Sequence, residues 1–210
     1  GKAKIKILEK NFLNSAKMAL KAGFDCIEIH MAHGYLLHQF FSPISNKRND
    51  IYGGTLENRC RFLLEIAKQI ANICKNKKII LGARITGKDW LKGGVDLKDS
   101  IYLSNKLKKL GFDYICVSSG GIKTTTNLNV NSKFNVDIAK KIKSKSSILT
   151  RVAGNIKDIS DAKRIIKKKN ADLVAFARPF LNNPNFLFKE KTKGDKNINI
   201  PKPYLRGFVT

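Results

Sequence analysis

Residues 24–41 read FDCIEIHMAHGYLLHQFF, and this stretch decides the fold. Its first part, residues 24–30, is short, apolar and β-branched, which predicts a strand buried on both faces. His30, His33 and Tyr35 follow where that strand ends. Because loops held by a rigid scaffold carry a large share of functional residues, we expect the site to begin here.

The remainder of the chain repeats a strand followed by a helix. Further strands are predicted at residues 78–86, 113–119, 147–153 and 171–177. Helices are predicted at residues 7–22, 55–73, 97–110, 134–143 and 159–168, with a last one opening at Arg178. This alternation indicates right-handed βαβ units and therefore an α/β protein with a parallel sheet.

Two parallel architectures fit such units. An open doubly wound sheet is one, but no G-x-G-x-x-G follows the first strand. The informative residues stand instead at the carboxyl ends of the strands: His30, Arg84, Ser118, Gly154 and Arg178. That distribution favours a (β/α)8 TIM barrel, whose active site lies at this face. Since five strands cannot close such a barrel, we expect about three N-terminal strands to be absent from this sequence.

The composition indicates one domain over residues 1–210. The chain is 42% hydrophobic and has no apolar run of the roughly 20 residues that a membrane-spanning helix needs. None of the four cysteines has C-x-x-C spacing, so Cys26 and Cys116 are interpreted as buried, reduced thiols. We expect a cytoplasmic protein without a metal or an iron–sulfur cluster, and organelle targeting stays open because the sequence does not begin with Met.

The net charge of +25 invites a nucleic-acid interpretation. The basic residues are mostly lysines at the ends of predicted helices, and no basic stripe is interleaved with aromatic residues that would stack on bases. We therefore interpret the charge as solvated helix surface. It would also attract anionic cofactors.

Two runs in the first third of the chain, HMAHGYLLHQFFSP (residues 30–43) and NKRNDIYGGTLENRCRF (residues 46–62), resemble the old yellow enzyme family. RVAGNI (residues 151–156) and ADLVAFARPFLNNP (residues 171–184) resemble the same family's phosphate-binding strands seven and eight. The resemblance covers the C-terminal part of such an enzyme, from before strand four onward. It implies an FMN-dependent oxidoreductase that reduces the C=C bond of α,β-unsaturated carbonyl compounds with NADH or NADPH.

His30 and His33 have two interpretations. A pair with H-x-x-H spacing is more often structural, and as a metal site it lacks a third ligand. At a strand end, however, two imidazoles can direct N–H donors at one oxygen that gains negative charge. The resemblance assigns them to the substrate carbonyl. It also implies that Tyr35, otherwise a packing aromatic residue, delivers a proton to the substrate's α-carbon.

The cofactor residues rest on charge and on the resemblance. Arg84 stands in an apolar strand and needs an anionic partner, either a carboxylate such as that of Glu28 or reduced flavin, which the resemblance favours. The phosphate-binding positions of a barrel correspond to Gly154, Asn155, Ala177 and Arg178. The family commonly has glycine where Ala177 stands, so the methyl group there requires a negative φ.

Residues 192–210 form a C-terminal tail. Its PKPYLRGF segment (residues 201–208) resembles the tail of a bacterial-type branch of the family, which implies that Arg206 binds substrate in a neighbouring subunit of a homo-oligomer. Two alternatives stay open from sequence. The chain could be a non-catalytic barrel fragment, or a basic nucleic-acid-binding protein on the same fold.

Overall fold

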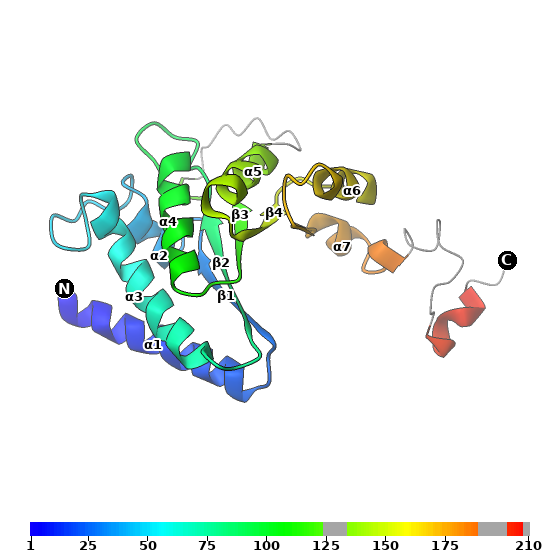
Figure 1. Ribbon diagram of the computed structural model, residues 1–210, viewed down its shortest axis with the longest axis horizontal. Coiled ribbons are helices and arrows are strands. Elements are labelled where there is room, and N and C mark those ends of the chain that lie inside the picture. The colour runs from blue at the N-terminus through cyan, green and yellow to red at the C-terminus, as the bar shows by residue number, and fades with distance from the viewer. Residues whose placement is uncertain (124–133, 189–200, 208–210) are drawn as a thin grey trace.

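The computed structural model describes residues 1–123, 134–188 and 201–207. Five strands form one parallel sheet: β1 (Cys26–Met31), β2 (Ile80–Thr86), β3 (Tyr114–Ser118), β4 (Leu149–Ala153) and β5 (Leu173–Ala175). The helices are α1 (Lys2–Lys21), α2 (Leu36–Phe41), α3 (Leu56–Cys74), α4 (Leu97–Lys109), α5 (Phe134–Ser146), α6 (Ile159–Lys167) and α7 (Arg178–Asn182), followed by the 3₁₀ helix η1 (Lys202–Gly207). Figure 1 labels most of these elements.

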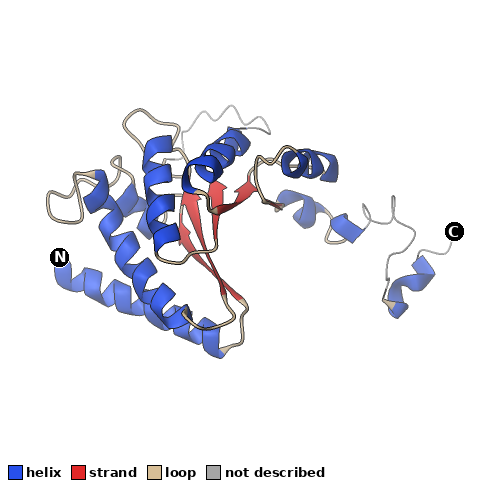
Figure 2. Ribbon diagram, in the orientation of Figure 1, coloured by secondary structure: helices blue, strands red, loops and turns tan. Residues whose placement is uncertain are grey.

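The sheet order is β1-β2-β3-β4-β5, so every strand pairs with the next one along the chain. In a doubly wound sheet the order of the strands reverses at a switch point, so that some consecutive strands are not neighbours. The described strands show no such reversal. Helices α3, α4 and α5 lie side by side against one face of the sheet, as the ribbon coloured by secondary structure shows (Figure 2). This order is the one that a barrel requires.

Alternation along the strands separates an apolar face from a polar one. The face toward the helices carries core residues, among them Ile29, Met31, Ala83, Ile85, Ile115, Val117 and Val152. We call the opposite side the inner face; it carries Cys26, Glu28, His30, Arg84, Cys116, Ser118 and Arg151. Because side chains alternate with a period of two, the same short strands build both the core and a polar surface.

The expectation that β1 is buried on both faces is wrong. Phe24 is 61% exposed and the strand begins at Cys26, which is an exposed free thiol rather than a buried one. β1 is an edge strand of the described sheet and its inner face is polar, so only one face packs against helices. Cys116, on the central strand β3, is buried as expected.

The largest differences from the predicted helices lie in the first part of the chain. Helix α1 begins at Lys2 rather than at residue 7, and α2 lies between the predicted strand at residues 24–30 and the predicted helix at residues 55–73, where no helix is predicted. Leu37 and Phe41 are both almost fully buried, and their four-residue spacing places them on one helical face. Among the described residues, no helix combines the length and the apolar character needed to cross a membrane.

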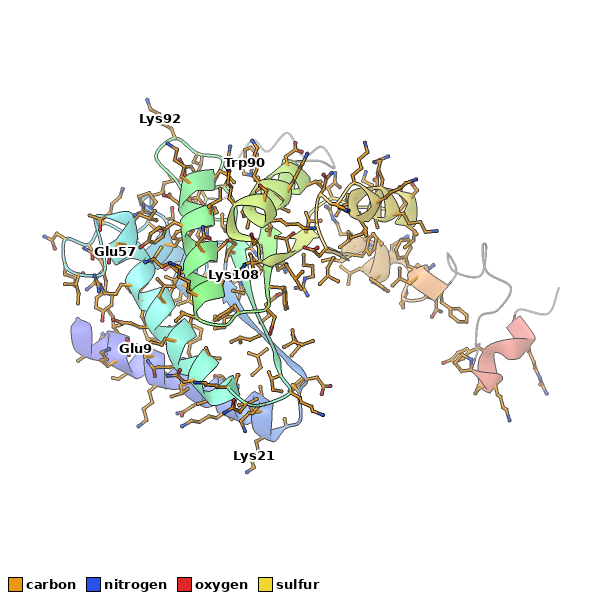
Figure 3. All side chains as sticks on the ribbon, in the orientation of Figure 1. Glu9, Lys21, Glu57, Trp90, Lys92 and Lys108 are labelled. Carbon is orange, nitrogen blue, oxygen red and sulfur yellow. The ribbon has the colours of Figure 1, made fainter. Side chains whose placement is uncertain are left out.

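The positive charge is spread over the outer surface. Lys21 and Lys92 are exposed on different parts of the chain and point away from the sheet (Figure 3). Lys108 on α4 is also exposed, and its Nζ donates to the carbonyl oxygen of Ser147 at 2.7 Å. This distribution agrees with the interpretation of the lysines as solvated helix and loop surface.

Candidate active site

A four-residue turn, residues 32–35, joins β1 to α2 and shapes the site. His33 (φ 58°) and Gly34 (φ 76°) both adopt left-handed conformations. A Cβ atom on Gly34 would lie 2.2 Å from the carbonyl oxygen of Gly121, so only glycine fits there. We call residues 32–35 the histidine turn, because it brings the side chains of His33 and Tyr35 next to that of His30 near the end of β1.

The turn gathers three aromatic side chains. The ring of His30 lies 5.2 Å from the ring of His33 and 4.9 Å from the ring of Tyr35, both in edge-to-face geometry. His30 Nδ1 accepts the backbone N–H of Ala32 at 3.2 Å, so in the neutral ring Nε2 carries the proton and is the donor. His33 Nε2 lies 2.7 Å from Ser118 Oγ at the end of β3.

Both imidazoles are held neutral. Partial burial, followed by the positive charge of Arg84, lowers the pKa of His30. The same two causes lower the pKa of His33 to about 4. Near neutral pH the pair therefore offers N–H hydrogen-bond donors rather than full positive charges.

This shift predicts a pH dependence of stability. Between about pH 6.5, where an unfolded histidine titrates, and about pH 4, the unfolded chain binds a proton that folded His33 does not. Stability should therefore fall as the pH drops through this window, by about 1 kcal/mol after allowing for the partial exposure of the ring. The variant His33→Asn keeps a donor but does not titrate, so it should lose this component. Denaturant unfolding of both proteins at several pH values measures it, and parallel pH profiles would contradict the prediction.

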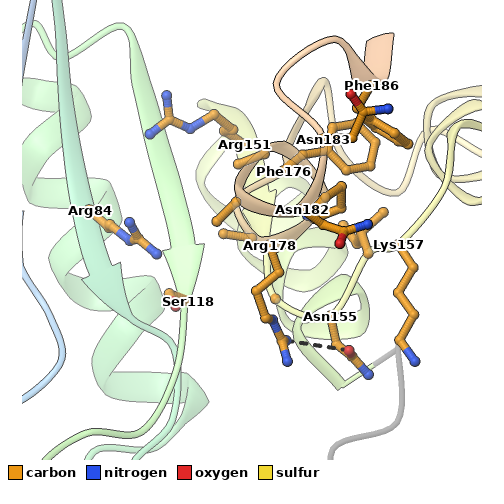
Figure 4. A pocket seen from close by; sticks show the side chains of 16 residues that line it. Arg84, Ser118, Arg151, Asn155, Lys157, Phe176, Arg178, Asn182, Asn183 and Phe186 are labelled. Atoms are coloured by element: carbon orange, nitrogen blue, oxygen red, sulfur yellow. Dashed lines mark hydrogen bonds between the residues drawn. The ribbon is translucent and has the colours of Figure 1, made fainter. Parts of the chain in front are cut away.

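A cavity of about 760 Å³ opens beside this cluster, at the carboxyl ends of β2 to β5 and against α7 (Figure 4). All five residues predicted to hold a cofactor line it: Arg84, Gly154, Asn155, Ala177 and Arg178. These residues come from three strand ends and from α7, up to 94 positions apart in sequence by their numbering. The volume lies within the range of pockets that bind small molecules and cofactors.

Arg84 faces this cavity as a cation without a carboxylate partner in the described chain. Its Nε atom is buried and makes no hydrogen bond there. Glu28, the alternative partner considered from sequence, is engaged elsewhere, because its Oε2 accepts the Tyr114 hydroxyl at 2.8 Å and lies 2.5 Å from Arg151. Of the two partners considered for Arg84, Glu28 is therefore not the one observed, and an anionic ligand would supply the missing partner.

The backbone at Gly154 and at Ala177 has a conformation that fits the residue found there. Gly154 (φ 124°) adopts a conformation that favours glycine, and a Cβ atom there would lie 2.6 Å from Asn135 Nδ2. Ala177 has φ −123°, so its methyl group is compatible with the backbone. Arg178 donates to Asn155 Oδ1 at 3.4 Å, the bond dashed in Figure 4.

Sequence reasoning gave no role to Arg151, which also lines the cavity. Its Nε atom is buried without a hydrogen-bond partner in the described chain, as in Arg84. The sequence feature that indicated Arg84 also applies to Arg151, because each is a permanent cation within a short, mostly apolar strand. Ser118, noted from sequence only as a strand end, lines the cavity and contacts His33.

Not every predicted site residue borders the cavity. His30, His33 and Tyr35 lie beside it, connected through Ser118 and through the pairing of His30 with Arg84 in the sheet register. Arg206 is exposed on η1, which Figure 1 shows apart from the strand ends. Of the predicted tail, residues 192–200 and 208–210 lie outside the described residues. Within the described parts, no three His, Cys, Asp or Glu side chains gather as a metal site would require.

The chain is similar to several curated NADPH dehydrogenases. The chain is 40% identical over 208 residues to an NADPH dehydrogenase of Clostridium acetobutylicum, covering 99% of this chain and 60% of that protein. It is 37% identical over 205 residues to the NADPH dehydrogenase of Bacillus subtilis, covering 98% and 60%. The chain thus spans about three-fifths of the length of the curated relatives that it matches.

Solved structures agree on the architecture. Morphinone reductase in complex with tetrahydroNAD superposes with a TM-score of 0.75 at 26% identity, covering 97% of this chain and 53% of that one. An old yellow enzyme homologue from Zymomonas mobilis gives a TM-score of 0.75 at 23% identity over 96% of this chain and 56% of that one, and this likeness shows the fold alone. The five strands are therefore part of a TIM barrel.

The family model described as the NADH:flavin oxidoreductase / NADH oxidase family matches residues 1–197. Together with the identities above, this match establishes the relationship over nearly the whole chain. The chain belongs to the NADH:flavin oxidoreductase / NADH oxidase family, the family of the old yellow enzymes.

Proposed function

We propose that this protein binds FMN in the cavity and reduces the C=C bond of α,β-unsaturated carbonyl compounds. Membership of the family implies FMN as the cofactor and NADH or NADPH as the reductant. The observation that carries the proposal is the Arg84 guanidinium, which has no carboxylate partner in the described chain and lines the same cavity as Gly154, Asn155 and Arg178.

The residues present fit FMN. Arg84 suits the pyrimidine edge of a flavin ring, which becomes anionic on reduction. Gly154, Asn155 and Arg178 lie at the opposite end, where a permanent cation and an open backbone suit a phosphate. Ala177 is also compatible with this backbone. A site for FMN needs these two anion-binding ends and a flat space between them.

The bound flavin would supply the hydride to the β-carbon of the substrate. His30 and His33 would hold the carbonyl oxygen, because their neutral rings can direct N–H groups at the same point. Negative charge grows on that oxygen as the β-carbon is reduced. Donors that are already in place stabilise this charge without the reorganisation that water would need.

Tyr35 would complete the reaction by giving a proton to the α-carbon. It stands at the N-terminal end of α2, 62% exposed, with its ring against that of His30. Its hydroxyl is therefore free to reach a ligand held by the histidines. Solvent is the competing proton source, and a variant without the hydroxyl separates the two.

We also propose that the protein is a homo-oligomer in which Arg206 enters a neighbouring site. The support is the similarity of residues 201–208 to the family's bacterial-type tails and the exposure of Arg206 on η1. In that position a guanidinium would close the substrate side of the partner's cavity.

The test of the function uses protein expressed from the complete reading frame. It should be yellow, release FMN on denaturation, lose its colour with NADPH, and regain it when an enone such as cyclohexenone is added. A colourless protein that takes up no FMN would favour a non-catalytic barrel. Tight and steeply salt-dependent nucleic-acid binding by such a protein would favour the basic binding module instead.

The variant His30→Ala tests the proposed oxygen-binding pair. It should retain FMN, because His30 does not line the cavity, yet bind a para-substituted phenol about tenfold more weakly through loss of one donor. The long-wavelength absorbance that phenols produce with bound flavin measures this affinity. Unchanged phenol affinity would remove His30 from the role.

A further inference from the structure

The mechanism above leaves one buried pair unused. His38 on α2 and Asp89 after β2 are both fully buried, with an exposed fraction of 0%. A buried acid and a buried histidine are costly to desolvate, so their presence in a core needs a reason. Both lie directly behind the histidine turn.

His38 holds the backbone of the turn. Its Nδ1 accepts the N–H of Gly34 at 2.8 Å, and Gly34 stands between His33 and Tyr35. A nitrogen that accepts this bond has no proton of its own, so the proton of a neutral ring is on Nε2. The bond to Gly34 therefore depends on which tautomer His38 adopts.

Asp89 selects that tautomer. Its Oδ1 lies 2.9 Å from His38 Nε2. The angle of this contact falls outside that of a normal hydrogen bond, and neither atom makes a hydrogen bond to any other group in the described chain, so each is the nearest available partner of the other. Its Oδ2 accepts the hydroxyl of Ser42 at 2.6 Å and the N–H of Val95 at 2.7 Å. Burial opposes ionisation of Asp89, but the contacts with His38 and Ser42 outweigh it and lower its pKa. An ionised carboxylate favours the proton on the facing nitrogen.

The turn is fixed at its neighbouring points as well. The N–H of His33 donates to Thr86 Oγ1 at 3.3 Å, and Gly34 abuts the backbone of Gly121 on the other side. The hydrogen bond from Gly34 N–H to His38 Nδ1 lies between the His33–Thr86 bond and the Gly34–Gly121 contact. It sets the position of the peptide that joins the two proposed site residues.

We propose that His38 and Asp89 form a positioning pair, in which Asp89 fixes the tautomer of His38 and His38 fixes the turn that carries His33 and Tyr35. The inference rests on the proposed function for its effect on catalysis, whereas its structural part stands without it. Neither residue touches substrate, since both lie in the core behind the turn.

The isosteric variant Asp89→Asn is the sharpest test. Its oxygen can still accept the bonds from Ser42 and Val95, which turns its NH₂ group toward His38 Nε2. That ring nitrogen must then accept, the proton moves to Nδ1, and Nδ1 can no longer accept from Gly34. Histidine-selective ¹⁵N labelling should show the change of tautomer, and the amide of Gly34 should lose protection from hydrogen exchange by about tenfold.

Two variants of His38 distinguish the effect of losing its hydrogen bond to Gly34 from the effect of changing its side-chain volume. His38→Asn retains an oxygen acceptor near the place of Nδ1, whereas His38→Leu does not. We expect Asn to keep exchange of the turn within about threefold of the wild type, and Leu to raise it at least tenfold. The control Leu107→Ala removes fully buried core volume on α4 away from the turn and should leave exchange there unchanged.

In the loaded protein, Asp89→Asn and His38→Leu should slow reoxidation by an enone about tenfold more than they slow bleaching by NADPH. An unchanged tautomer in Asp89→Asn, or equal behaviour of the Asn and Leu variants, would overturn the inference. Equal loosening of the turn in Leu107→Ala would do the same, because it would mark a general loss of stability. If the wild type takes up no FMN, the proposed function fails while the tautomer and exchange measurements still decide this proposal.

Discussion

Replacing Tyr35 by phenylalanine is expected to slow the reoxidation of the reduced protein by an enone about 10²- to 10⁴-fold, the range typical of losing a general acid. Bleaching by NADPH should stay within about twofold of the wild type, since that half-reaction delivers no proton to a carbon. The reason is local. The Tyr35 ring packs 4.9 Å from the His30 ring, while its side chain remains 62% exposed toward incoming ligand. Stopped-flow absorbance at the flavin band measures the two half-reactions separately.

Tyr102→Phe is the matched control for this change. Tyr102 lies on α4, where Lys106 stacks on its ring at 5.2 Å, on the side of the sheet away from the cavity. Removing its hydroxyl should alter neither half-reaction. Normal reoxidation in Tyr35→Phe would assign the proton to solvent, and equal slowing of both half-reactions would point to a disturbed cofactor site instead.

The fold was predictable because its signals are local. Each strand lies in a short, largely apolar run, and sequential βαβ units leave few ways to arrange such runs. The observed order β1 to β5 and the cavity at the carboxyl ends follow from that reasoning. Ala177 is an instructive detail, because the negative φ that its methyl group requires is the one observed.

What could not be predicted depends on pairs that are distant in sequence. Glu28 meets Arg151 across 123 positions, and His38 meets Asp89 across 51 by their numbering. Periodicity indicates that such side chains share a face of an element, but it cannot say which partner each one finds. For this reason Glu28 was weighed as the partner of Arg84, and His38 received no role from sequence. The apolar run around Cys26 predicts a buried thiol, whereas this side chain is exposed in the described sheet.

Replacing Arg84 by methionine is expected to have opposite effects on the empty and the loaded protein. Without ligand, the change removes a partly buried cation that has no carboxylate partner in the described chain, so stability should hold or rise by about 1 kcal/mol. With ligand, a charge-assisted contact to the flavin ring is lost. FMN affinity should therefore fall about 10- to 100-fold. Thermal unfolding with and without added FMN measures both effects on one sample.

Riboflavin has the flavin ring but no phosphate. Comparing its binding with that of FMN therefore shows which end of the cavity holds the ring and which holds the phosphate. Arg178→Met should weaken FMN binding about tenfold and leave riboflavin binding unchanged, because Arg178 lies with Asn155 at the opposite end from Arg84. Arg84→Met should weaken both ligands alike, since it acts on the ring that they share. If Arg84→Met spared riboflavin while Arg178→Met did not, the flavin would lie in the reverse direction. The histidine pair would then face the phosphate, where neutral imidazoles could not serve the proposed reduction.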